Sequence, residues 1–210
     1  MAREHYRDVL ICTPARDGKF HALYVAGILQ STSLNGGWLP MAGQSDIYVA
    51  RNVLMNTFLQ RTEYKTMVFI DSDIGFTAKD LKTLIDSNED VVSGLYTNKT
   101  QPPMPFARGI DGVEVKPEDI PPEGMIQAMF VPGGFLKIER HVLDTIIDKK
   151  LVPTYGGGKL HHFYNGRIFE ENLLSEDYSF CHLVREAGFQ PWLHCGIRLN
   201  HDGRTFDAQP

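Results

Sequence analysis

The stretch Met67-Val68-Phe69-Ile70-Asp71-Ser72-Asp73 decides the fold, because an apolar run ends abruptly in two acids separated by one small residue. The run predicts a strand buried on both faces, and open α/β sheets bind ligands at the carboxyl ends of such strands. Alternate strand residues point the same way, so Asp71 and Asp73 can converge on one cation. Mg²⁺ and Mn²⁺ take oxygen ligands and are commonly shared with substrate phosphates. We therefore predict a metal site that holds a nucleotide diphosphate.

The rest of the chain places this strand in an alternating pattern. Strands are predicted at 8–12, 67–70, 90–95 and 125–131, with a loop at 13–18 and helices at 20–28, from 46, from 77, at 139–147 and at 175–187. Such alternation predicts an α/β fold with a Rossmann-like, mostly parallel central sheet flanked by helices. Residues 102–122 are rich in proline and glycine and are predicted to form a hairpin or an irregular excursion. With no repeat or low-complexity linker, residues 1–210 are predicted to form one domain.

Composition narrows the class of protein. The 210 residues are 42% hydrophobic and 22% charged, as is usual for a globular domain, and the net charge is −5. This charge argues against a broad nucleic-acid-binding surface but leaves room for a local basic groove. We expect no membrane span, since no apolar stretch is long enough. Cys12, Cys181 and Cys195 are odd in number and scattered, which favours reduced thiols and predicts a cytoplasmic protein.

Four further features each have a structural and a functional interpretation. Glu176 and Asp177 open a helix, where acids are favoured by the helix dipole, or one of them is a general base. His201 is a surface residue or a metal ligand. Arg51 is a helix-surface cation, or it binds phosphate or pairs with an acid of the site. Gly133-Gly134 forms a tight turn or lets the backbone approach a sugar closely.

Taken in order, these segments resemble a nucleotide-sugar-dependent glycosyltransferase of the GT-A fold, similar to small cytoplasmic members from bacteria and their phages. The matching segments are the first strand with Thr13-Pro14, the helix with Ala50-Arg51-Asn52, Phe69-Ile70-Asp71-Ser72-Asp73, Gly133-Gly134-Phe135, Ser175-Glu176-Asp177-Tyr178-Ser179-Phe180 and His201-Asp202-Gly203. The resemblance implies a GT-A-like domain in which roughly residues 1–100 bind the donor and residues 101–210 bind the acceptor.

The resemblance also implies a metal site. Asp71 and Asp73 would be the DxD motif, with Asp73 a direct ligand of Mn²⁺ (or Mg²⁺) and Asp71 contacting the ribose or a metal-bound water. His201 would be the third protein ligand. Ser72, between the two acids, is counted with the donor-binding residues.

Further roles follow from the same resemblance. Thr13, Pro14 and Arg16 would border the base and ribose of the donor, and Arg51 would support the donor near the acid pair. Gly133 and Gly134 would flank the transferred sugar. Asp177 or Glu176 would take the acceptor proton in an inverting enzyme, and in a retaining enzyme they would position a substrate.

The predicted function is metal-dependent transfer of a sugar from a nucleotide diphosphate, with a UDP-sugar favoured, to an acceptor hydroxyl. The acceptor stays open between a glycan, a protein or small metabolite, and a hydroxymethylated pyrimidine in phage DNA, which would require a basic channel and base flipping. Two alternatives are a phosphatase of the haloacid-dehalogenase type, which also places Asp-x-Asp after a buried strand, and a non-catalytic sugar-nucleotide-binding module. The sequence does not indicate the oligomeric state.

Overall fold

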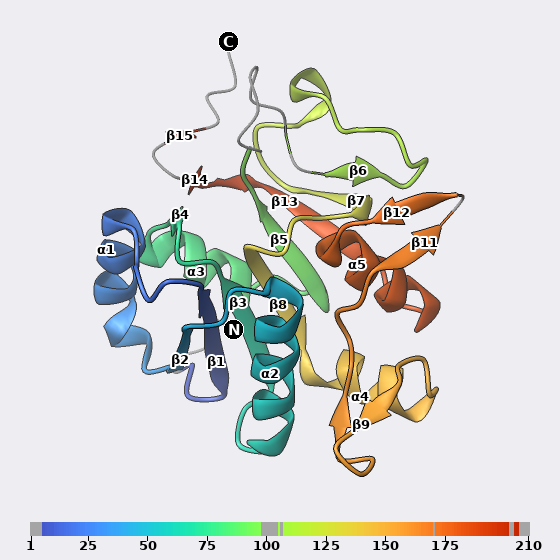
Figure 1. Ribbon diagram of the computed structural model, residues 1–210. Coiled ribbons are helices and arrows are strands. Elements are labelled where there is room, and N and C mark those ends of the chain that lie inside the picture. Colours follow the sequence, from blue (N-terminus) through green and yellow to red (C-terminus); the bar gives the residue numbers. More distant parts are fainter. Residues whose placement is uncertain (1–5, 98–104, 106, 170, 202–203, 206–210) are drawn as a thin grey trace.

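The computed structural model describes residues 6–97, 105, 107–169, 171–201 and 204–205, and it centres on one large sheet (Figure 1). Along this sheet the eight strands are β2 (Gly37–Ala42), β1 (Val9–Ala15), β3 (Thr66–Ile70), β8 (Phe135–Glu139), β5 (Val91–Leu95), β13 (Pro191–Arg198), β7 (Met125–Phe130) and β6 (Arg108–Gly109).

The direction of the strands makes the sheet mostly parallel, as predicted. β1 pairs in parallel with β2 and β3, and β5 with β13. β8 runs antiparallel between β3 and β5, and β7 runs antiparallel between β13 and β6. The other six strands therefore share one direction. Strands from both halves of the chain are neighbours in the sheet, so the two predicted halves share one core.

The helices begin where the sequence places capping residues. They are α1 (Ala22–Gln30), α2 (Ile47–Gln60), α3 (Ala78–Ile85), α4 (Arg140–Asp148) and α5 (Glu176–Glu186), with short 3₁₀ turns at Ser31–Leu34 and Pro117–Asp119. The Asp46 carboxylate accepts hydrogen bonds from the first free N–H groups of α2, and Thr77 with Asp80 forms a capping box for α3. Ser175 caps α5 in the same way. These caps confirm the predicted starts of three helices.

Strand alternation divides the core into two layers. Leu10, Cys12, Met67 and Phe69 face α2, α4 and α5, whereas Val9, Ile11, Val68 and Ile70 face α1 and α3. All five residues of β3 are buried because helices cover both faces of the sheet at this point.

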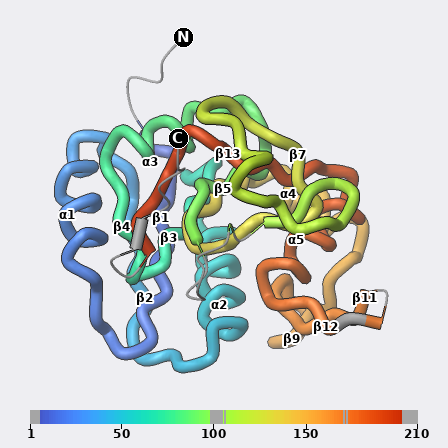
Figure 2. Tube along the Cα trace, turned by 90° about the horizontal axis from the view of Figure 1, so that it is seen from above, coloured from blue at the N-terminus to red at the C-terminus, as the bar shows by residue number. Residues whose placement is uncertain are grey.

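Short strands form three smaller sheets beside the large one. They are the hairpin of β9 (Thr154–Tyr155) and β10 (Leu160–His161), the hairpin of β11 (Arg167–Phe169) and β12 (Asn172–Leu174), and the sheet of β4 (Ile74–Gly75), β14 (Asn200–His201) and β15 (Arg204–Thr205). The two hairpins lie at the opposite end of the molecule from α1, in the view from above as well (Figure 2).

β1 continues through Thr13 and Pro14, where a loop was expected, because these residues pair with Pro40 and Met41 of β2. All three cysteines are buried and unpaired, as expected of reduced thiols. Within the described residues, no helix combines the length and apolar character needed to cross a membrane.

Candidate functional site

The acid pair lies at the carboxyl end of β3, as predicted. The N–H of Asp71 donates to the Gly134 carbonyl (2.9 Å), and the N–H of Ile74 donates back to the Asp71 carbonyl (3.0 Å). These bonds fold residues 71–74 into a turn between β3 and β4. The turn places Asp71, Ser72 and Asp73 at the edge of the sheet where open α/β folds bind ligands.

A cleft of about 350 Å³ opens beside this turn. It is lined by Pro14, Arg16, Gln44, Ser45, Ile47, Asp71, Ser72 and Asp73. The volume falls within the range of small-molecule pockets, roughly 300–1,000 Å³. The structure thus brings five of the predicted donor-binding residues together around one cavity.

Three lining residues were not predicted to bind anything. Gln44, Ser45 and Ile47 surround Asp46, the residue that caps α2. A helix N-terminus next to a strand end commonly binds anions, so the capping signal at Asp46 could have identified them.

Thr13 lies away from this cleft, in contrast to its predicted place at the base and ribose. Its side chain is fully buried and its hydroxyl is 2.5 Å from the Tyr24 hydroxyl. The Trp38 indole N–H donates to the same Tyr24 hydroxyl (2.9 Å). Because β1 is longer than predicted, Thr13 is a buried strand residue that pairs with Pro40 of β2.

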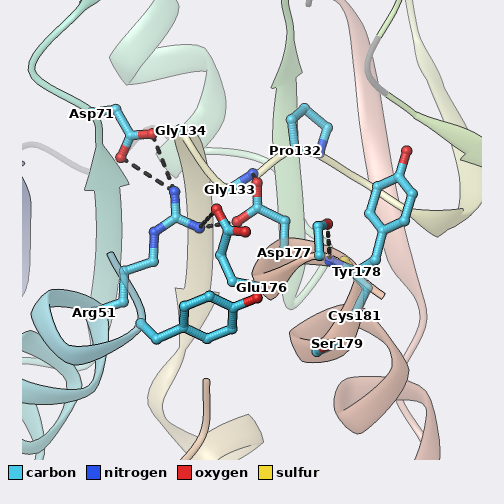
Figure 3. Close-up of polar contacts among 12 residues, drawn as sticks. Arg51, Asp71, Pro132, Gly133, Gly134, Glu176, Asp177, Tyr178, Ser179 and Cys181 are labelled. Carbon is cyan, nitrogen blue, oxygen red and sulfur yellow. Dashed lines mark hydrogen bonds and ion pairs between the residues drawn. The ribbon is translucent and has the colours of Figure 1, made fainter. Parts of the chain in front are cut away.

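Arg51 is the centre of the site. Its Nη2 donates to Oδ2 and Oδ1 of Asp71 (3.1 and 3.3 Å), and its Nη1 contacts Oδ1 of Asp177. Glu176 Oε1 lies 4.0 Å from the same Nη1. Figure 3 shows the guanidinium between Asp71 on one side and the two acids of α5 on the other. Of the two interpretations given to Arg51, pairing with acids of the site is the one observed.

The surroundings of Arg51 keep it charged. The side chain is 2% exposed and lies over the rings of Phe69 and Tyr164, whose centroids are 5.6 and 5.4 Å from Cζ. Burial by itself lowers the pKa of Arg51, but Asp71 and Glu176 outweigh it and hold that pKa above its usual value. Burial raises the pKa of the Asp71 carboxyl, and Arg51 opposes that change.

Gly133 and Gly134 permit a close approach of the backbone to these charged groups. The Gly133 N–H donates to Asp177 Oδ2 (2.9 Å), and the Gly134 N–H donates to the Tyr96 hydroxyl (2.8 Å). A Cβ on Gly133 would overlap Asp177 and Arg51, and one on Gly134 would lie 2.6 Å from the Tyr96 hydroxyl. Both positions therefore require glycine because side chains already occupy the space.

The two acids of α5 differ in accessibility. The Asp177 side chain is 8% exposed and is held by Arg51 and the Gly133 N–H. The Glu176 side chain is 24% exposed, and its Oε1 lies 4.0 Å from Arg51 Nη1. Glu176 is thus the more accessible of the two acids.

His201 approaches the acid pair through pairing of β14 with β4. His201 pairs with Ile74, and its Nε2 lies 3.6 Å from Asp73 Oδ2. The His201 Nδ1 lies 2.7 Å from the Thr97 carbonyl oxygen, which can only accept, so Nδ1 carries the proton. Nε2 is the ring nitrogen that faces Asp73. Gly203 of the same motif lies outside the described residues.

Tyr96 was missed by sequence reasoning. It follows β5, accepts the Gly134 N–H, and packs its ring edge-on against His201, with centroids 5.1 Å apart. The sequence contains no local signal for this role, because the contacts join segments far apart in the chain.

The charges around the cleft fit a cation. Asp71, Glu176 and Asp177 lie around the Arg51 guanidinium, and Asp73, two residues after Asp71, adds a fourth acid beside His201. Such an excess of negative charge at a sheet edge is relieved by a bound cation. Among the residues that the structure describes, no group of three or more His, Cys, Asp or Glu side chains is arranged so that it could hold a metal ion.

Comparison with known proteins finds a similar fold but no related sequence. No protein-family model and no curated protein matches this sequence. Among solved structures, A197 from STIV is similar, with a TM-score of 0.60 and 16% sequence identity over 95% of this chain and 86% of that one. At this identity the likeness shows a shared α/β fold.

Proposed function

We propose that this protein is a metal-dependent glycosyltransferase of the GT-A fold that moves a sugar from a nucleotide diphosphate, with a UDP-sugar favoured, to an acceptor hydroxyl. One observation carries the proposal. The Asp71-Ser72-Asp73 turn ends a buried parallel strand and lines a cleft of about 350 Å³ with Pro14 and Arg16, while His201 lies 3.6 Å from Asp73.

Donor binding is assigned to this cleft. Pro14 and Arg16 lie at the end of the first strand and offer an apolar surface and a cation, and Gln44 with Ser45 adds polar groups to the lining. The arrangement suits a base and ribose at one end and a diphosphate near the acid pair.

A metal ion, Mn²⁺ or Mg²⁺, is assigned to Asp73 and His201. A carboxylate and a neutral imidazole suit first-row divalent ions, and the bond from His201 Nδ1 to Thr97 orients Nε2 as metal-binding histidines require. When bound, the ion neutralises charge on the leaving diphosphate. Asp71, committed to Arg51, supplies negative charge beside the ion.

Arg51 is assigned a positioning role. Both of its terminal nitrogens are engaged by Asp71 and Asp177, so it orients these acids. The Gly133-Gly134 backbone is fixed by the same cluster, and we assign it to the side of the transferred sugar.

Glu176 is the better candidate for the group that takes the acceptor proton. A general base needs access to the hydroxyl, and Glu176 is more exposed than Asp177. Asp177 then holds Arg51 and Gly133 in place. The phosphatase alternative would use Asp71 as the nucleophile, which its pairing of both oxygens with Arg51 disfavours.

The test is thermal stabilisation by UDP, GDP, CDP and dTDP, with and without Mn²⁺. We expect a metal-dependent shift for one nucleotide, with about 2.7 kcal/mol of stabilisation at 100 times Kd. Asp73→Ala should lose this shift. Asp144→Ala, which removes an exposed acid from α4, should keep it. No shift with any nucleotide would overturn the proposal.

A further inference from the structure

A second cavity lies on the flank of α2, between this helix and the β9–β10 hairpin. Its volume is about 300 Å³. It is lined by Val49, Asn52, Pro153, Thr154, Tyr155 and His162. None of these residues belongs to the proposed donor cleft, so the cavity is a separate feature of the protein.

Two asparagines of α2 hold the far wall of this cavity in place. Asn52 donates to the Tyr164 carbonyl (2.7 Å) and accepts the Tyr164 N–H (3.0 Å). One turn later, Asn56 makes the same pair of bonds with His161, both at 2.8 Å. These four bonds, here called the asparagine clasp, attach residues 161–164 to α2 as a neighbouring strand would. The wall is therefore preformed.

The clasp also connects the cavity with the reaction centre. Asn52 follows Arg51 directly, and the Tyr164 ring packs against the Arg51 guanidinium with 5.4 Å between Cζ and the ring centroid. His162 lies two residues before Tyr164, roughly 7 Å along an extended chain. Through Asn52 and Tyr164, the wall of this cavity is therefore joined to the Arg51 cluster.

The lining has the chemistry of a carbohydrate site. Tyr155 is 42% exposed and its ring stands edge-on to that of His162, with centroids 6.3 Å apart. With Pro153 and Val49 it offers an apolar surface, and Thr154 and His162 offer hydrogen-bonding groups. A sugar ring combines an apolar C–H face with hydroxyls, and pockets of aromatic surface with few polar groups suit it.

The lining of the cavity carries no positive side chain, which favours a neutral glycan over DNA as its ligand. No lysine or arginine is among the lining residues, whereas binding to a nucleic-acid backbone depends on such cations. The nearest loop cation in sequence, Lys159, is exposed on the hairpin and does not line the cavity.

We propose that this cavity is a subsite for a neutral oligosaccharide acceptor, with one sugar unit stacked on Tyr155. This inference rests on the proposed function and names its acceptor class as a glycan. Binding of hydroxymethylated DNA at this cavity is the competing result that the test can detect.

In the experiment, the biotinylated protein bound to streptavidin is applied to a printed array of neutral mono- and oligosaccharides, with UDP and Mn²⁺ present. A duplex containing 5-hydroxymethylcytosine is the parallel probe. Glycans that bind are then titrated against the wild type, Tyr155→Ala and Tyr155→Phe. Tyr155→Ala should weaken glycan binding roughly tenfold or more, because the stacking surface is lost, and Tyr155→Phe should retain it. Melting temperatures of the variants, and the UDP–Mn²⁺ shift of the wild type, are recorded in parallel.

Each outcome separates this inference from the proposed function. Glycan binding that depends on the Tyr155 ring supports the subsite. Glycan binding unchanged in Tyr155→Ala, or no glycan binding while UDP–Mn²⁺ stabilises the protein, overturns the subsite and leaves glycosyl transfer standing. Duplex binding that depends on Tyr155 overturns the glycan in favour of DNA. Ring-dependent glycan binding without nucleotide stabilisation keeps the saccharide site and overturns glycosyl transfer.

Discussion

The two sides of the site are built in different ways. The proposed donor edge, meaning Pro14, Arg16 and residues 71–73, follows the ends of β1 and β3 in an eight-stranded sheet. The proposed acceptor wall, meaning residues 153–164, consists of a hairpin of two-residue strands and a glycine loop with three positive φ angles. The donor edge is thus fixed by a buried sheet, whereas the acceptor wall depends on a few side-chain links.

This difference shows where each side is vulnerable. A strand in the middle of a sheet is held by backbone bonds that no single substitution removes. The acceptor wall is held by the asparagine clasp and by the packing of Tyr164 on Arg51. Arg51 belongs to both sides, because it pairs with Asp71 at the donor edge and with Asp177 of α5.

Arg51→Ala should therefore have the largest effect, because it disrupts both sides at once. Removing one member of a buried ion pair leaves uncompensated charge and typically costs about 3–5 kcal/mol. Here Asp177 and the largely buried Asp71 would lose their shared partner. The free energy of unfolding, measured in urea, checks this. Arg7→Ala, which removes an exposed arginine, should change it by less than about 0.5 kcal/mol. A loss of under about 1 kcal/mol in Arg51→Ala would show that the guanidinium does not link the two sides.

Gly133→Ala comes next and acts where the two sides meet. The added methyl group would overlap Asp177 and Arg51, and an ion pair held on both sides cannot easily give way. Overpacking of this kind costs about 1–3 kcal/mol, and we expect the upper part of that range. Gly166→Ala is the matched control, since its new methyl would meet only Leu173 at an ordinary 3.7 Å. Equal melting temperatures for the two variants would contradict the close packing around Gly133.

The contrast between the sheet edge and the wall held by side chains also explains which features could be predicted from the sequence. The strand before Asp71, the caps at Asp46, Thr77 and Ser175, and the mostly parallel sheet follow from local periodicity and hydrogen-bonding chemistry, and the structure confirms them. The meeting of the acid pair with Pro14 and Arg16 follows because strand ends share one edge of a sheet.

Other features could not be predicted, since they depend on contacts between distant segments. β8 lies in the centre of the sheet, but it is short and runs directly into α4, so its sequence reads as a turn and a helix start. Thr13 is buried because β2, which was not predicted, pairs with the end of β1. Nothing near Asn52 or Tyr96 in the sequence indicates that they bind the backbone at positions 164 and 134.

Asn52→Ala should weaken the acceptor wall alone. It removes both bonds to Tyr164 and leaves buried backbone groups unsatisfied, which costs roughly 2 kcal/mol. Hydrogen exchange should become faster at the Tyr164 amide and stay unchanged in β3. Asn88→Ala, at an exposed position after α3, should alter neither. Faster exchange in β3 would mean that the two sides are not held independently.

Asp46→Ala should have the smallest effect, and it tests the helix that both sides share. The Asp46 carboxylate accepts N–H bonds from Tyr48 (2.9 Å) and Val49 (3.3 Å), and loss of such a cap costs about 1 kcal/mol. In a chain of this size that lowers the melting temperature by roughly 2–4 °C. Asp46→Asn keeps a capping oxygen and should stay close to the wild type, so an equal loss in both variants would assign the effect to charge.

The first turns of α2 carry Ile47 in the donor cleft and Val49 in the second cavity. Fraying at this end should therefore weaken nucleotide stabilisation and glycan binding together, whereas Asn52→Ala should reduce glycan binding and spare the nucleotide.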